Sequence, residues 1–171
     1  MNYYLISDGE MIGGWLLITY FGKTEAEQDG AIARVLYFFE KNWEELLKFS
    51  RRTQRQLDRW AARYGYKEQP RDILEHAKKG CHAGRYTCVN LQNSDTIEFR
   101  IFRGTLKYNT FIATLQMVDR ICDVALFLSD EEIKAMSWST FVASCQAPEL
   151  VQYLKERRLY VNDIVSAEEE I

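Results

Sequence analysis

The sequence is poor in the residues that build metal centres and lacks a common nucleotide-binding motif. It has two histidines, His76 and His82, and four cysteines that form no C-x-x-C pair. Clusters of cysteine and histidine at ligand spacing are typical of metal sites, so we expect no metal site. A glycine-rich loop of the G-x-x-x-x-G-K-[ST] type is also missing, which excludes the usual phosphate-binding loop of nucleotide hydrolases.

Long apolar segments are missing as well. No hydrophobic run reaches membrane-spanning length, and the first residues lack a basic region followed by an apolar one. We therefore expect a soluble, cytoplasmic protein without a membrane partner. Cys88 and Cys122 stand in apolar surroundings, which predicts buried thiols in a reduced chain. The formal net charge of -3 argues against direct nucleic-acid binding.

The composition is that of a single globular domain. With 171 residues, 47% of them hydrophobic and 13% aromatic, the chain can bury a sizeable core but is short for two domains. We expect one domain over residues 1–158. An extended acidic tail over 159–171, which includes Glu168, Glu169 and Glu170, is expected to follow it.

Hydrophobic periodicity predicts an α+β fold, with a small antiparallel sheet packed against several amphipathic helices. Strands are expected over 2–6, 12–21, 86–91 and 96–101. Capping boxes begin at Thr24, Thr53 and Ser129, and Asn109 is expected to cap a further helix. The predicted helices cover about 24–49, 53–64, 70–80, 109–126, 129–136, 139–145 and 148–158, and Ser137 with Trp138 is expected to break the helix after 136.

The segment 96–106 is the most informative part of the sequence. Its alternation places Ile97, Phe99 and Ile101 on one strand face, as expected for a core face. Glu98 and Arg100 share the opposite face, where they can present charges to a ligand. The other interpretation is an exposed ion pair on a solvated sheet face, which has little functional content.

The segment 86–91 is expected to pair with this strand. Asn93, Ser94 and Asp95 between the two segments have the chemistry of a hairpin turn, so the pairing should be antiparallel. Alternation then allows Asn90 to join Glu98 and Arg100, with Arg85 at the entry to the strand.

Arginines are concentrated after the first long helix. Two interpretations stay open for this dense positive side: a solvated helix face, or a surface that holds phosphate or an acidic partner. The arginines concerned are Arg51, Arg52, Arg55, Arg59 and Arg63.

Two segments carry a resemblance to a known family. Segment 85–91 reads RYTCVNL and segment 96–106 reads TIEFRIFRGTL. With the helical segments 36–53 and 111–124, they make the chain from Tyr20 onward resemble the amidoligase family of phages and mobile elements in Firmicutes. Members of that family are carboxylate-amine ligases with a glutamine-synthetase-like fold. The resemblance implies a partial fold of that kind.

The resemblance also implies roles for individual residues. In such ligases strand carboxylates hold divalent metal, and arginines neutralise nucleotide and acyl-phosphate oxygens. Glu98 would be a metal or amine-site carboxylate, Arg100 and Arg85 would clamp phosphate or substrate, and Asn90 would orient a substrate. Arg103 is a further candidate for binding a ligand or partner.

The chain departs from the family pattern at its N-terminal side. Family members have a substantial part ahead of the long helix, with metal carboxylates and a histidine-bearing strand. Here the segment 15–19 has no histidine, and the acids before Tyr20 are Asp8 and Glu10. A site for ATP and several metal ions needs more converging carboxylates. The sequence therefore predicts an N-terminally truncated amidoligase-like domain in which Glu98, Arg100 and Asn90 are vestigial.

Three functions remain open. The first is a non-catalytic, cofactor-free protein that binds another protein, such as an inhibitor of a CRISPR-associated nuclease made by a phage or mobile element. The second is an ATP- and Mg-dependent carboxylate-amine ligase completed by a partner subunit or a second copy. The third is a structural role in a larger assembly. A truncated sheet edge also predicts a homodimer, because unpaired strands invite association.

Overall fold

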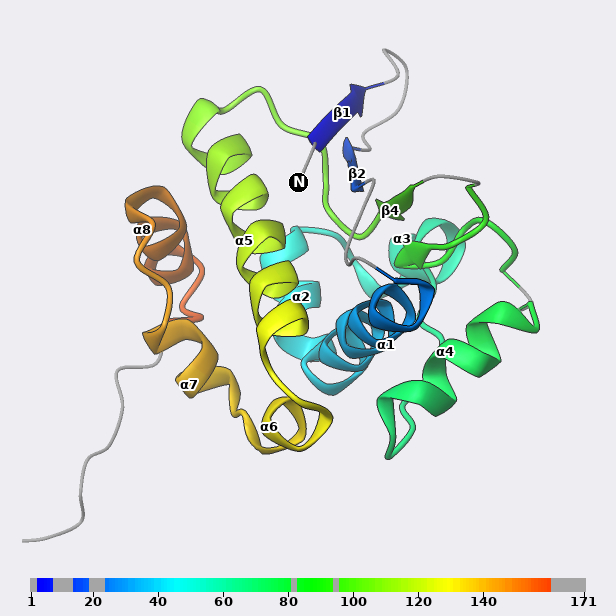
Figure 1. Ribbon diagram of the computed structural model, residues 1–171. Coiled ribbons are helices and arrows are strands. Elements are labelled where there is room, and N and C mark those ends of the chain that lie inside the picture. The colour runs from blue at the N-terminus through cyan, green and yellow to red at the C-terminus, as the bar shows by residue number, and fades with distance from the viewer. Residues whose placement is uncertain (1–2, 8–13, 19–23, 81–82, 94–95, 161–171) are drawn as a thin grey trace, which may run out of the picture.

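The computed structural model describes the chain except for residues 1–2, 8–13, 19–23, 81–82, 94–95 and 161–171, and for 3–7 and 14–18 only the backbone is considered. Its described part is a mostly helical α+β fold, as predicted (Figure 1). The strands are β1 (Tyr3–Ser7), β2 (Gly14–Ile18), β3 (Val89–Asn90) and β4 (Ile97–Phe99). The helices are α1 (Glu25–Lys41), α2 (Trp43–Ser50), α3 (Gln54–Trp60), α4 (Pro70–Lys78), α5 (Tyr108–Phe127), α6 (Asp130–Ala135), α7 (Trp138–Ala143) and α8 (Pro148–Glu156).

The four strands form one antiparallel sheet in the order β1-β2-β4-β3. The predicted antiparallel pairing of the segments 86–91 and 96–101 is confirmed, although both strands are shorter than expected. In its register Asn90 lies opposite Glu98, and Val89 lies opposite Phe99. The predicted hairpin turn includes residues 94–95, which lie outside the described residues.

Helix α1 is the central element of the helical layer. It packs against α4 on one side and α5 on the other, and α8 packs against α5 (Figure 1). Phe39 of α1 contacts Phe99 of β4, with ring centroids 5.7 Å apart, so the predicted apolar strand face does point into the core. Cys88 and Cys122 are buried free thiols, as expected.

The predicted helix over 24–49 is wrong in one respect, because a break at Asn42 divides it into α1 and α2. Asn42 has φ −108° and ψ 36°, and it ends α1. Its buried side-chain amide donates to the Phe38 carbonyl at 3.0 Å, as does its backbone N–H at 3.1 Å. Asparagine side chains compete in this way with the regular helical hydrogen bonds, which explains the break.

The end of α3 also differs from the prediction. The helix stops at Trp60 instead of continuing to Tyr64, and Ala61 has φ −155° and ψ 50°. Ala62 then forms a parallel bridge with Thr87, in which its N–H donates to the Tyr86 carbonyl and its own carbonyl accepts from Cys88. The chain after α3 therefore covers the outer side of the segment that leads into β3.

Most of the predicted helix starts are confirmed. Thr24, Thr53 and Ser129 each form a complete capping box, with the residue three positions later. Asn109 is not a cap, because α5 begins at Tyr108 and Lys107 occupies the cap position without a side-chain hydrogen bond. Ser137, predicted only as a break, caps α7.

A buried carboxylate joins α1 to the segment after α3. Glu40 has 3% relative exposure, and its Oε1 accepts from the Tyr64 backbone N–H at 2.7 Å. Its Oε2 accepts from Arg63 Nε at 2.9 Å. Arg63, one of the arginines predicted for a binding surface, therefore pairs with a buried carboxylate although its own side chain is partly exposed.

Replacing Glu40 by alanine should lower the free energy of unfolding by about 2–3 kcal/mol, because the buried Tyr64 N–H loses its acceptor. Urea unfolding measures the change. Glu44→Ala, in which an exposed glutamate of α2 is truncated, is the matched control and should have a small effect. Equal losses in the two variants would contradict a linking role for Glu40.

Candidate functional site

The structure brings together three of the predicted site residues in one hydrogen-bonded network. Glu98 Oε1 accepts from Arg100 Nη1 at 2.7 Å, and Glu98 Oε2 accepts from Asn90 Nδ2 at 2.8 Å. The register of β3 and β4 explains this meeting, because it places Asn90 beside Glu98 on one face of the sheet. Arg100 Nε also donates to the Trp60 carbonyl at 3.4 Å.

This network is buried, which corrects the interpretation of Glu98 and Arg100 as an exposed ion pair. Their relative exposures are 5% and 3%, and that of Asn90 is 2%. A charge pair without water must satisfy its polar atoms internally, since unpaired buried charges are strongly unfavourable. Both Glu98 oxygens have an internal donor, so the carboxylate is used to hold the sheet and the end of α3 together.

Arginines surround one side of this network. Arg52 Nη2 donates to the Phe102 carbonyl at 3.0 Å, and Arg51 Nη2 donates to the Arg103 carbonyl at 3.1 Å. Burial and the positive charges of Arg100 and Arg103 lower the pKa of Arg52 to about 10. The structure thus brings together the predicted residues Arg51, Arg52 and Arg103. Arg55 is exposed on the first turn of α3, and none of the described contacts joins it to this group.

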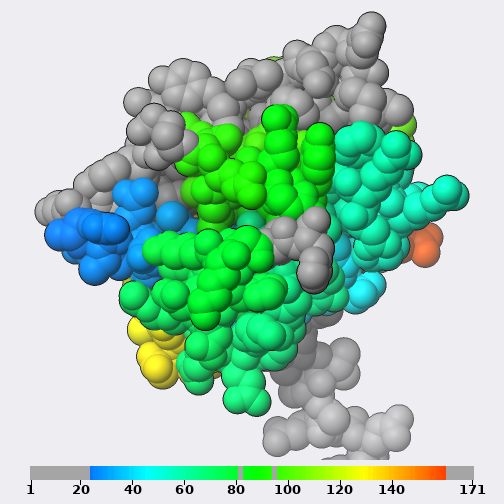
Figure 2. All heavy atoms as spheres, turned by 90° about the vertical axis from the view of Figure 1, so that its right-hand side faces the viewer, coloured from blue at the N-terminus to red at the C-terminus, as the bar shows by residue number. Residues whose placement is uncertain are grey.

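On the other side of Arg100, arginines and aromatic rings alternate. The Arg100 guanidinium lies 5.3 Å from the Tyr86 ring centroid, and Arg85 lies 5.7 Å from the same ring. The rings of Tyr86 and Trp60 meet edge to face at 5.4 Å, and Arg59 lies 4.8 Å from the Trp60 ring. In Figure 2, α3 (teal) lies beside the green segment 83–93 on this face of the molecule.

We call Arg59, Trp60, Arg85 and Tyr86 the arginine–aromatic surface. Arg59 and Arg85 are exposed, and Tyr86 keeps 39% of its surface accessible. Sequence reasoning had assigned Arg59 and Arg85 as binding residues but missed the two aromatic rings. The available signal was the pair of Arg-aromatic dipeptides, at 59–60 and 85–86.

The described residues do not assemble a metal site of the usual kind. No group of three or more histidine, cysteine, aspartate or glutamate side chains among them is placed to hold an ion. The acids Asp8 and Glu10 lie outside the described residues. The candidate metal carboxylate, Glu98, accepts hydrogen bonds from Arg100 and Asn90 instead.

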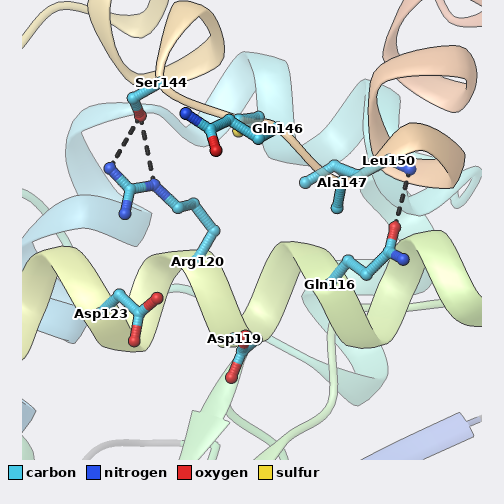
Figure 3. A pocket seen from close by; sticks show the side chains of 9 residues that line it. Gln116, Asp119, Arg120, Asp123, Ser144, Gln146, Ala147 and Leu150 are labelled. Carbon is cyan, nitrogen blue, oxygen red and sulfur yellow. Dashed lines mark hydrogen bonds between the residues drawn. The ribbon is translucent and has the colours of Figure 1, made fainter.

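A hollow lies between α5 and the start of α8 (Figure 3). Its volume is about 470 Å³. Arg120 crosses it to donate from Nε and Nη2 to Ser144 Oγ, at 3.2 and 2.9 Å. Gln116 Oε1 accepts from the Leu150 N–H at 2.8 Å, so α5 is joined both to the end of α7 and to the start of α8. This hollow was not predicted from the sequence.

Asp119 and Asp123 line this hollow one helical turn apart. Burial raises the pKa of Asp123 above its usual value, and the nearby charge of Asp119 raises it further, while Arg120 opposes the shift. Like charges at this spacing are unfavourable on a helix.

Comparisons with protein-family models, with curated proteins and with solved structures give no match to the chain. Among the described helices, none combines the length and apolar character needed to cross a membrane.

Glu98→Gln should lower the free energy of unfolding by about 3 kcal/mol, because the buried guanidinium of Arg100 loses the carboxylate that it contacts. In a cycle of Glu98→Leu, Arg100→Met and the double variant Glu98→Leu/Arg100→Met, the double variant lacks both charges, so its loss should be well below the sum of the losses in the two single variants. Urea unfolding of the four proteins of this cycle measures the coupling. A stabilising Glu98→Gln would contradict a structural role, since replacing functional carboxylates often increases stability.

Asp123→Asn should raise the melting temperature at pH 7. The folded-state pKa of Asp123 is raised, so its charge destabilises the fold above that pKa and protonation removes the penalty as the pH falls. The advantage of the variant should therefore shrink as the pH falls toward 3.8, the ordinary pKa of an aspartic acid. Melting curves across this range test the prediction, with the exposed Glu131→Gln as control. An advantage that is constant with pH would contradict it.

Proposed function

We propose that the chain is a non-catalytic binding protein derived from an amidoligase, with a partial glutamine-synthetase-like ligase fold. In this proposal it is a counter-defence inhibitor of a phage or mobile element, and it acts in the bacterial cytoplasm by binding a protein such as a CRISPR-associated nuclease. It needs no cofactor for this role, and a homodimer remains a further expectation.

The hydrogen bonding of the Glu98 carboxylate is the observation that supports this proposal most directly. A ligase carboxylate must turn its oxygens toward a metal ion or an amine, whereas both oxygens of Glu98 accept hydrogen bonds from buried side chains. The residues that match the family pattern therefore support the sheet. A fold that retains them in this role has kept the scaffold without the geometry that the reaction requires.

The arginine–aromatic surface supplies the binding part of the proposal. Tryptophan, tyrosine and arginine are the residue types that dominate the energetics of protein interfaces. Here they form a row in which each ring contacts at least one guanidinium group.

A cleavage assay with a CRISPR-associated nuclease tests the proposed target. Cleavage should fall when the protein is present at or above the concentration of the nuclease, and Arg59→Ala/Arg85→Ala should restore it. Both arginines are exposed, so the variant should keep the melting temperature. Arg71→Ala, which changes an exposed arginine of α4, should still inhibit. Full cleavage at excess wild-type protein would remove this target.

The alternative, a ligase completed by another subunit, makes a different prediction. Binding of ATP and Mg²⁺ to the folded chain would raise its melting temperature, and the shift would grow with the ratio of ligand concentration to dissociation constant. We expect no shift. A shift that depends on both ligands and disappears in Glu98→Gln would favour the ligase over the binding protein.

A further inference from the structure

The loop between β4 and α5 exposes apolar and cationic side chains next to one another. Leu106 has 106% relative exposure, which means that its side chain has no shielding from the fold, and Tyr108 has 71%. Arg103 and Lys107, in the same loop, are also exposed. A single exposed leucine is ordinary, but two exposed apolar residues and two cations within six positions form a small mixed surface.

The start of this loop is fixed to the end of α2 and to the two arginines that follow it. The Arg103 N–H donates to the Ser50 carbonyl at 3.2 Å. The carbonyls of Phe102 and Arg103 accept from Arg52 and Arg51 respectively. The Phe102 ring packs edge-on against Phe49 at 5.8 Å. A surface held in this way loses little conformational entropy when a partner binds.

The positive charge of this region is not neutralised within the described residues. None of the ion pairs formed there involves Arg51, Arg52 or Arg103. The Nε of Arg52 is buried and has no hydrogen-bond partner. The nearest acid of the network, Glu98, is already paired with Arg100. An external carboxylate would therefore find an uncompensated positive field at this place.

We propose that these side chains form a docking surface for an acidic peptide segment of another protein, one that carries apolar side chains among its carboxylates. The surface, called the loop surface here, consists of Arg51, Arg52, Arg103, Leu106, Lys107 and Tyr108. The cations would pair with carboxylates of the segment, and Leu106 with Tyr108 would contact its apolar side chains. This inference holds whether or not the target of the proposed function is a nuclease.

Two other kinds of occupant fit the loop surface less well. A nucleic acid would pair with the arginines, but a fully exposed leucine offers it no stacking plane, and the net charge of -3 repels it. A membrane surface would gain little from two apolar side chains, since stable anchoring requires much larger apolar insertion. A mixed acidic and apolar peptide uses both parts of the surface.

The test measures binding of a fluorescent peptide in which glutamate pairs alternate with leucine, by anisotropy with the full chain. Leu106→Ser should weaken binding about tenfold, as expected for the loss of a buried leucine contact, and Arg103→Gln should weaken it about fivefold. Both changes affect exposed side chains, so melting temperatures should stay the same. The matched controls are Phe127→Ser, at the opposite end of α5 with 81% exposure, and Arg71→Gln on α4.

Two further probes separate the possible occupants. A peptide with serine in place of leucine should bind about tenfold more weakly than the parent peptide, and an oligothymidylate of equal charge should bind more weakly still. Equal binding of the oligothymidylate, unaffected by Leu106→Ser, would assign the surface to nucleic acid and overturn the proposal. Failure of the parent peptide to bind, or an equal loss in the Phe127→Ser control, would also overturn it.

Discussion

The buried carboxylate of Glu98 is the interaction on which the rest of this structure depends. It accepts from Asn90 on the neighbouring strand and from Arg100, which follows the end of its own strand. Arg100 in turn contacts the Trp60 carbonyl and the Tyr86 ring. One acid therefore fixes the alignment of β3 with β4 and the position of the chain that follows α3. The arginine–aromatic surface exists because these segments are held side by side.

Local signals in the sequence were sufficient for most elements of the fold. Apolar alternation identified the core face of β4, and Thr24, Thr53 and Ser129 identified helix starts, because caps act on their immediate neighbours. The break at Asn42 was missed because its apolar stripe continues from α1 into α2. Helix propensity and hydrophobic periodicity do not predict that a single side chain will form a hydrogen bond to the carbonyl of the preceding turn.

The sequence was sufficient to predict which residues meet in the candidate site, but not that they are buried. The alternation of the two strands was enough to place Asn90 with Glu98 and Arg100. Their burial depends on tertiary packing, since the segments that contact Arg100, at Trp60 and Tyr86, are distant in the sequence. The exposure of Leu106 could not be predicted either, because an isolated apolar residue in a loop carries no periodicity.

The bridge between Ala62 and Thr87 has a consequence for assembly. It shields the β3 side of the sheet, so among the described strands β1 forms the opposite, outer edge. Another chain could then add a strand to this sheet only along the outer edge of β1. If two copies of the chain paired their β1 strands antiparallel, neither copy would keep an unpaired edge. The result would be a closed two-fold dimer that cannot extend into a fibre.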